Sequence, residues 1–323
     1  MTTILTGDCI AAMKTLEEKT VQTCVTSPPY FGLRDYGHPG QIGLEPTPED
    51  FVSAMVAVFR EVRRVLRDDG TLWLNLGDTY AANRGGTTPP AQTVAGGIGG
   101  KGGQKERRGQ ADGYNPTRDC TRYGLKHKDL IGIPWRVAFA LQADGWYLRQ
   151  DIIWHKPNPM PESVRDRCTK AHEYIFLLSK SQKYFFDNEA IKVPVKQDWG
   201  TRNRTNGKYH NEGTGLQPHS GLEKSYEKAN KRSVWSVTTK PYKGAHFATF
   251  PPALIEPCIL AGSCPGDIVL DPFGGSGTTG AVAIEHGRRS ILIELNPEYI
   301  PLIQERLEKA KPKPSPQPEL FSL

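Results

Sequence analysis

The stretch "TSPPY" at residues 26–30 places a hydroxyl, two prolines and an aromatic ring next to one another. Proline fixes its own φ and donates no backbone hydrogen bond, so Pro28 and Pro29 predict a rigid, extended exit from the apolar run before them. Such a segment holds the Ser27 hydroxyl, the Pro28 carbonyl and the Tyr30 ring in fixed relative positions. Standing alone it is typical of a structural loop, so its chemistry depends on the rest of the chain.

A second stretch, "DIVLDPFGGSGTTG" at residues 267–280, runs from an apolar strand through glycines into a helix. Gly275 and Gly277 begin a G-x-G-x-x-G pattern, and Glu294 ends the next apolar run 19 residues after Gly275. Glycines at this spacing let a ligand approach the backbone, and the acid is suited to ribose hydroxyls. The pattern fits a nicotinamide dinucleotide, S-adenosylmethionine (AdoMet), or a tight turn without a ligand. Polar groups suited to the amino-acid end of AdoMet lie in the same stretch: Asp271, Ser276 and Thr278.

With the two stretches in this order, the sequence resembles the amino-methylating DNA methyltransferases of the β arrangement, which are of prokaryotic or phage type. In that family a (D/N/S)PP(Y/F) motif precedes an FxGxG cofactor motif, and target recognition lies between them. The resemblance extends to "GDCIAAM", "WHKPNPMPE", "HFATFPPALIEPCI" and "IELNPEY". It implies a single catalytic domain over residues 1–311, with AdoMet as methyl donor and double-stranded DNA as substrate.

The resemblance gives the "TSPPY" stretch a catalytic role. An exocyclic amine is a poor nucleophile because its lone pair is delocalised into the base. Acceptors on its hydrogens, Ser27 Oγ and the Pro28 carbonyl, would expose that lone pair, and Pro29 would help to hold them in place. Tyr30 would stack on the base after it is flipped out of the duplex. Cys24 is interpreted as a core residue rather than the nucleophile of carbon-5 methylation, because it lies inside a strand.

The resemblance also assigns cofactor residues. Asp8 and Cys9 would read the adenine edge, although Asp8 is also suited to cap a helix. Glu294 would hold the ribose hydroxyls. The other implied cofactor residues flank the adenine or line the methionine end: Leu295, Asn296, Phe273, Gly275, Gly277 and Thr278. Three residues that border the base pocket in the family are equally consistent with a surface strand end here: Trp154, His155 and Lys156.

Around these motifs, apolar residues alternate between strand and helix periods. The predicted strands are residues 3–8, 21–28, 71–77, 146–156, 173–180, 267–273 and 290–295. The predicted helices are residues 9–18, 48–67, 134–145, 251–263, 276–286 and 297–310. This alternation predicts an α/β fold with a doubly wound, mostly parallel sheet and helices on both faces. The resemblance specifies a Rossmann-like AdoMet-dependent methyltransferase with an inserted target-recognition region.

Basic residues are concentrated in two segments of a chain whose net charge is +6. Residues 82–128, which are rich in glycine, hold nine Lys and Arg against three acids, and residues 192–246 hold eleven against four. Two such segments favour a polyanionic partner. We expect target recognition within residues 190–245, through Arg202, Arg204, Lys208, Lys231 and Arg232. Loop 82–128 is either a closure over DNA or a disordered insertion, and the proline-rich tail 312–323 is predicted to be disordered.

The remaining features limit the function. No apolar run approaches the roughly 18 residues of a membrane span, and the six cysteines form no CxxC pair, so we expect no membrane, no metal and a cytoplasmic, DNA-associated enzyme. Serine before the prolines favours cytosine N4 over adenine N6 within the family. Adenine N6 is the nearest alternative, followed by RNA methylation and dinucleotide-dependent oxidoreduction. A cognate restriction endonuclease and a second copy of the chain are the protein partners considered.

Overall fold

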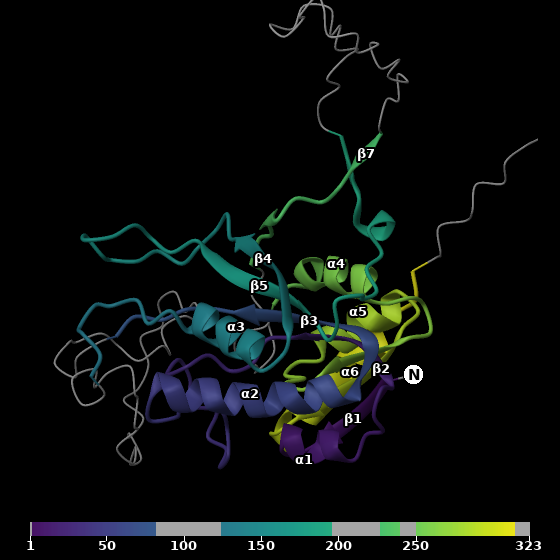
Figure 1. Cartoon of the computed structure of the whole chain (residues 1–323), viewed down its shortest axis with the longest axis horizontal. Coiled ribbons are helices and arrows are strands. Elements are labelled where there is room, and N and C mark those ends of the chain that lie inside the picture. Colours follow the sequence, from purple (N-terminus) through teal and green to yellow (C-terminus); the bar gives the residue numbers. More distant parts are fainter. Residues whose placement is uncertain (1, 82–123, 196–226, 240–249, 314–323) are drawn as a thin grey trace, which may run out of the picture.

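The computed structural model describes residues 2–81, 124–195, 227–239 and 250–313, and these form one large sheet with helices on both faces (Figure 1). The sheet has eight strands in the order β1-β10-β9-β2-β3-β5-β4-β8. Its strands are β1 (Thr2–Thr6), β2 (Val21–Thr26), β3 (Leu66–Leu76), β4 (Tyr147–His155), β5 (His172–Ser179), β8 (Val234–Ser236), β9 (Ile268–Asp271) and β10 (Arg289–Glu294). A separate antiparallel pair joins β6 (Val193–Pro194) to β7 (Lys228–Ala229).

Only β5 runs against its neighbours in this sheet, pairing antiparallel with both β3 and β4. The other strand pairs are parallel. The helices that connect the strands are α1 (Cys9–Lys14), α2 (Pro48–Val65), α3 (Ile133–Ala143), α4 (Pro252–Gly262) and α5 (Thr278–Glu285), and α6 (Ile300–Lys309) follows the last strand. The mostly parallel, doubly wound sheet predicted from the sequence is therefore confirmed.

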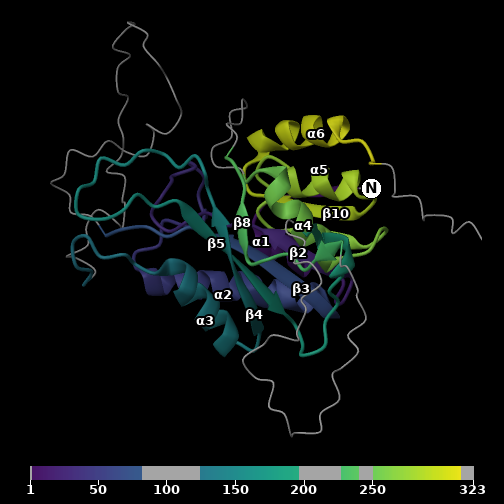
Figure 2. The ribbon, with the colours of Figure 1, turned by 90° about the horizontal axis from the view of Figure 1, so that it is seen from above.

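The two faces of the sheet are covered by different helices, because alternate strand residues point to opposite sides. Cys24 and Leu72 pack with α1, α2 and α3, whereas their neighbours Val25 and Trp73 pack with α4 and α5. Figure 2 shows α2 and α3 on one side of the strands and α4, α5 and α6 on the other.

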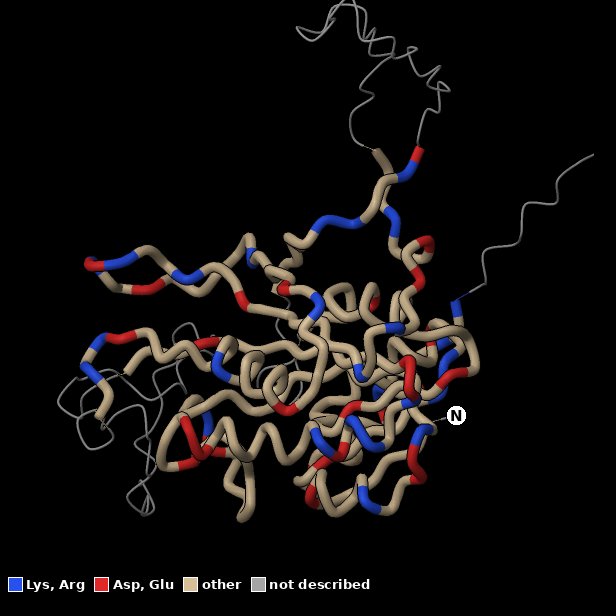
Figure 3. The backbone as a smooth tube through the Cα atoms, in the orientation of Figure 1, with Lys and Arg blue, Asp and Glu red and all other residues tan. Residues whose placement is uncertain are grey.

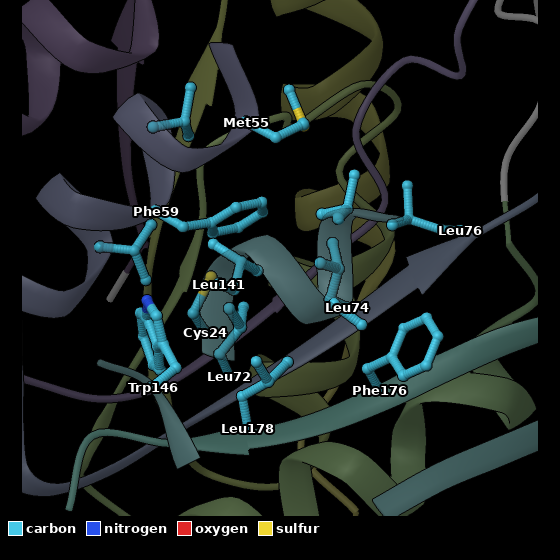
Figure 4. Close-up of a cluster of buried hydrophobic side chains, with 14 of the residues drawn as sticks. Cys24, Met55, Phe59, Leu72, Leu74, Leu76, Leu141, Trp146, Phe176 and Leu178 are labelled. Atoms are coloured by element: carbon cyan, nitrogen blue, oxygen red, sulfur yellow. The ribbon is translucent and has the colours of Figure 1, made fainter. Parts of the chain in front are cut away.

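The larger core lies between the sheet and α2. Phe51, Met55, Phe59 and Val62 repeat at helical spacing and are fully buried, so one apolar stripe of α2 faces the sheet. Figure 4 shows the centre of this cluster, where side chains from α2 and α3 meet those of β3 and β5. Cys24 is among them, and burial raises the pKa of its thiol well above its ordinary value. A thiol kept neutral in the core agrees with a packing role.

Several boundaries differ from the sequence prediction. The helix predicted over residues 9–18 ends at Lys14, because the hydroxyl of Thr15 donates to the Ala12 carbonyl and closes the last turn. The helix predicted to end at residue 67 ends at Val65, where the chain passes directly into β3. Lys313, assigned to the disordered tail, instead pairs with Glu256 and Glu285 at 2.6 and 3.1 Å. Residues 314–323 of that tail and most of loop 82–128 lie outside the described residues.

Candidate active site at the ends of β2 and β9

The two stretches, "TSPPY" and the glycine-rich loop, meet at the carboxyl ends of two central strands of the sheet. β2 and β9 are neighbouring parallel strands, with Cys24 opposite Leu270. Ser27 follows the last residue of β2, and the glycine-rich loop follows the last residue of β9. Open α/β sheets bind ligands at the carboxyl ends of such strands, where the chain winds away in both directions. Residues 245 positions apart, Thr26 and Asp271, are joined here by a hydrogen bond of 2.6 Å.

Asp271 holds together the place where the ends of β2 and β9 meet, which we call the junction. Its carboxylate accepts from the Thr26 hydroxyl, from the Thr279 hydroxyl at 2.7 Å and from the Phe273 amide at 3.1 Å. Burial raises the pKa of Asp271 to about 7, with only 2% of the residue exposed. From its place in the glycine-rich stretch, Asp271 is predicted to lie at the methionine end of AdoMet. In the structure, its hydrogen bonds are directed to β2, α5 and its own loop.

The glycine-rich loop turns sharply and packs closely. Gly275 and Gly277 have φ values of 53° and 77°, which favour glycine. A Cβ on Gly277 would lie 3.0 Å from Ile303 Cγ2 of α6, so this position brings the two helices together. Gly275 is half-buried, and its amide donates to Glu294 Oε2 at 2.8 Å. Gly275 and Gly277 therefore serve different purposes: Gly277 allows α5 and α6 to pack closely, and the Gly275 amide binds the Glu294 carboxylate.

Glu294 lies at the end of β10 with 8% of its surface exposed. Its Oε1 accepts from the Asn296 amide at 2.9 Å, and burial raises its pKa. A carboxylate oxygen has two lone pairs, so each oxygen keeps one for a further donor such as a ribose hydroxyl. This carboxylate, fixed beside a glycine turn, fits the ribose of a nucleoside-containing cofactor.

The adenine-side residues predicted from the sequence also gather at this edge. The Gly7 amide donates to the Glu294 carbonyl at 2.9 Å, which brings the start of α1 to the end of β10. Asp8 caps α1, accepting from the Ala11 amide at 2.8 Å. Cys9 is buried, and burial raises the pKa of its thiol to about 12. Leu295 and Asn296 are half-buried immediately after Glu294.

Ser276 and Thr278 have a partner that the sequence did not reveal. The guanidinium of Arg306, on α6, donates to the Ser276 hydroxyl at 2.8 Å and also to the Thr278 hydroxyl. The two predicted cofactor hydroxyls are therefore held by a cation at the start of α5. No motif marks Arg306, because it occupies an ordinary position in the last turns of an amphipathic helix.

The "TSPPY" stretch presents Ser27 and Tyr30 beside the junction, and Tyr30 is firmly held. Its ring packs on Gly77 at the end of β3, where a Cβ would approach Tyr30 Cε2 to 2.5 Å. Its hydroxyl donates to Glu173 Oε2 at 2.7 Å and lies 3.2 Å from Asn75 Oδ1. Ser27 Oγ donates to the same hydroxyl at 3.4 Å. Burial and the Glu173 charge raise the pKa of Tyr30 well above its ordinary value, so it remains a neutral phenol.

Glu173 and Lys156 complete this cluster. Lys156 Nζ donates to Glu173 Oε1 and lies 4.4 Å from the centre of the Trp154 ring. The two charged side chains are only 16% and 20% exposed. One signal in the sequence could have pointed to Glu173, a charged residue at the start of an apolar strand. Because β5 is antiparallel, its first residues lie beside the carboxyl ends of its neighbours, and that direction cannot be read from the sequence.

The residues predicted to bind DNA are only partly described. Arg202, Arg204 and Lys208 lie outside the described residues. Lys231 and Arg232 precede β8, where Lys231 lies 5.0 Å from the centre of the Trp235 ring and the Arg232 carbonyl accepts from the Trp235 indole at 2.7 Å. Lys and Arg residues lie along the segment from β7 to β8 (Figure 3). Part of the predicted recognition region thus forms an edge strand of the main sheet.

A basic hollow of about 380 Å³ lies at the opposite end of the strands, between Lys19, Arg63 and Lys180. Its cations are largely paired within the protein, Lys19 with Asp68 at 2.9 Å and Arg60 with Asp144 at 2.6 Å. It is distinct from the junction described above. Among the described residues, no helix is long and apolar enough to cross a membrane, and no three His, Cys, Asp or Glu side chains are grouped as metal ligands.

The chain is similar to known proteins over most of its length. The family model for N6/N4 DNA methylases matches residues 21–305. The type II methyltransferase M.XycI of Xanthomonas campestris pv. cyanopsidis is 48% identical over 95% of this chain and 87% of its own length. M.SmaI of Serratia marcescens is also 48% identical, over 94% of this chain and 90% of its own.

Solved structures show the same fold at lower identity. The cytosine-N4-specific PvuII DNA methyltransferase aligns with a TM-score of 0.61 at 18% identity, covering 94% of this chain and 86% of its own. TTHA0409 of Thermus thermophilus, complexed with S-adenosyl-L-methionine, aligns with a TM-score of 0.58 at 24% identity, covering 97% and 95%. The fold, the junction of the two motifs and the family match lead to one conclusion: this chain belongs to the N6/N4 DNA methylases and is an AdoMet-dependent DNA methyltransferase.

Proposed function

We propose that the protein methylates the N4 amine of cytosine at a specific site in double-stranded DNA, and that it acts as the modification enzyme of a type II restriction system. One observation carries the base assignment. The side chain between Thr26 and the two prolines is a neutral hydroxyl, and it stands beside the glycine loop of β9. The names of the 48% identical relatives support the type II role.

In this proposal Ser27 Oγ and the Pro28 carbonyl accept the two hydrogens of the target amine. Pro28 and Pro29 fix the backbone that carries both acceptors, so little rearrangement accompanies the reaction. The Tyr30 ring, immobilised by Gly77 and by its hydroxyl contacts, packs on a base flipped from the duplex. A ring that is already fixed loses little freedom when the base arrives.

The cofactor residues are proposed at the neighbouring strand ends. Glu294 would hold the ribose hydroxyls, and Asp8 and Cys9 would border the adenine. The glycine loop and Phe273 would line the methionine end, close to the hydroxyls that Arg306 binds. When bound there, AdoMet supplies the methyl group as an electrophile. The protein's task is to present the amine to it and to remove one proton afterwards.

Product analysis tests this proposal. Unmethylated plasmid DNA is incubated with the enzyme and AdoMet, digested to nucleosides and compared with chromatographic standards for N4-methylcytosine, 5-methylcytosine and N6-methyladenine. We expect N4-methylcytosine, which must be separated from 5-methylcytosine by retention because their masses are equal. N6-methyladenine would overturn the base assignment and leave amine methylation intact. Parallel reactions on single-stranded DNA and on RNA of the same sequence test the choice of duplex DNA.

A further inference from the structure

A chain of hydrogen bonds leads away from Ser27 through the protein interior. Ser27 Oγ donates to Tyr30 Oη at 3.4 Å, a contact longer than the roughly 2.5–3.0 Å of an ordinary hydroxyl hydrogen bond. Tyr30 Oη donates to Glu173 Oε2 at 2.7 Å. The chain therefore begins at the proposed amine acceptor and ends at a carboxylate. Both hydroxyls point their hydrogens toward Glu173.

The surroundings keep this chain in place. Asn75 donates to the Tyr174 carbonyl at 3.0 Å, which fixes its amide beside the Tyr30 hydroxyl. Lys156 pairs with the other oxygen of Glu173, and both charged side chains are at least four-fifths buried. Three side chains, Lys156, Tyr30 and Asn75, thus donate to the buried Glu173 carboxylate. So many partners indicate a role for Glu173 beyond closing a loop.

The reaction creates a need for such a path. As the nitrogen–carbon bond forms, the carbon–sulfur bond of the cofactor breaks and its electron pair stays on sulfur. The positive charge passes to the amine nitrogen, which must then lose one proton. A serine hydroxyl can take that proton only if it gives up its own, because a doubly protonated hydroxyl is a strong acid.

We propose that Ser27, Tyr30 and Glu173 form a proton relay that carries this proton from the methylated amine to the Glu173 carboxylate. The amine proton moves to Ser27 Oγ, the Ser27 proton to Tyr30 Oη, and the Tyr30 proton to Glu173 Oε2. Serine and tyrosine end as neutral hydroxyls, the base is neutral, and Glu173 has become a carboxylic acid. Glu173 touches neither the base nor the cofactor and acts through Tyr30.

The relay rests on the proposed placement of Ser27 against the amine. It explains how a neutral residue can stand before the two prolines, where other family members carry an aspartate. Here the carboxylate is supplied from β5 and reached through the tyrosine of the same motif. The structure thereby separates two tasks, acceptance of a hydrogen bond by Ser27 and storage of the proton by Glu173.

Two variants test the relay with little change of shape. Glu173→Gln keeps an oxygen that accepts from Tyr30 but cannot store a proton, and Tyr30→Phe keeps the ring but removes the hydroxyl. We expect each to lower the single-turnover rate of methyl transfer by about 10²-fold, with unchanged affinity for AdoMet and DNA. The double variant is expected to be no slower than either single variant, because both break the same path.

Asp166→Asn is the matched control, since Asp166 is an exposed acid on the same β4–β5 connection that pairs with Lys128 at 2.6 Å. It should retain the wild-type rate. Losses that multiply in the double variant, or a full rate in Glu173→Gln, would overturn the relay. Ser27→Ala separates the two proposals. If it is slow while Glu173→Gln is fast, only the relay fails; if Ser27→Ala itself is fast, the proposed role of the "TSPPY" stretch fails.

Discussion

Ser27 carries a neutral hydroxyl at the position where the proposed mechanism needs a hydrogen-bond acceptor for the target amine. A neutral hydroxyl attracts an amine hydrogen less strongly than a carboxylate does, so its contribution must come from fixed position. The buried Pro28 and the end of β2 supply that position. In the proposed mechanism, activation of the amine therefore depends on the fixed positions of two acceptors, Ser27 Oγ and the Pro28 carbonyl.

Replacing Ser27 by alanine should therefore remove most turnover while the fold persists. We expect a loss of about 10²-fold or more, as for other preorganised hydrogen-bonding groups, with AdoMet and DNA binding retained. Methyl transfer from labelled AdoMet under single-turnover conditions measures the rate, and calorimetry measures cofactor binding. Equal loss of AdoMet affinity would instead indicate that the loop had collapsed.

Glu294 is a second residue whose effect is local. Glu294→Gln leaves one oxygen to accept from the loop but places an amide where a ribose hydroxyl would donate. We expect AdoMet to bind more weakly by about 1.5–3 kcal/mol, the range for hydrogen bonds to charged groups. Titration calorimetry checks this, with Glu298→Gln as control, since Glu298 is exposed on the same turn. A wild-type dissociation constant would refute the ribose assignment.

At the scale of elements, Asp271 couples β2, β9 and α5, and its protonation links their assembly to pH. The folded protein holds the Asp271 pKa at about 7, against 3.8 ordinarily. Between these values the folded chain keeps a proton that the unfolded chain releases. The contribution of Asp271 to stability is therefore full below pH 3.8 and declines as the pH rises to about 7.

The free energy of unfolding should accordingly fall with rising pH more steeply in the wild type than in Asp271→Asn. The difference in slope should reach about 1.4 kcal/mol per pH unit and vanish above pH 7. Urea unfolding at half-unit intervals from pH 4 to pH 8 measures both curves. Because every other titrating group is shared, subtracting the curves isolates Asp271, and parallel curves would contradict the coupling.

The sequence predicted the strand and helix order well, because apolar periodicity is a local property. It also predicted which two motifs meet, through their resemblance to a family. It did not predict Asn75, Glu173 or Arg306, which reach the site from β3, β5 and α6. Their positions depend on strand order and on the reversed direction of β5, which are set by packing across the whole sheet.

At the scale of the whole molecule, the basic residues between positions 192 and 246 are predicted to make DNA affinity depend strongly on salt. Neutralising Arg202, Arg204, Lys231 and Arg232 should flatten the plot of log affinity against log salt by up to about four in slope, roughly one for each cation withdrawn from a phosphate. Fluorescence anisotropy at several salt concentrations measures this slope.

The matched control removes the same charge elsewhere: Lys19, Arg60, Arg67 and Lys309. These four side chains are about half exposed or more and lie toward the other end of the strands. The control variant should keep the wild-type slope, and both variants should bind AdoMet normally. An unchanged slope in the first variant would place DNA contacts elsewhere, with the basic loop 82–128 the next segment to test.

The pairing of β2 with β9 also has a consequence for how the enzyme is made. A ribosome releases β1 and β2 long before β9 and β10, the two strands that lie between them in the finished sheet. Contacts between such distant residues form late and slowly. A chain still being synthesised thus lacks the glycine loop and Glu294, although Tyr30, Asn75 and Glu173 are already present, and a chain truncated before residue 268 should be inactive. In a cell that expresses this protein, methylation should therefore begin only after β10, which ends at Glu294, has been synthesised.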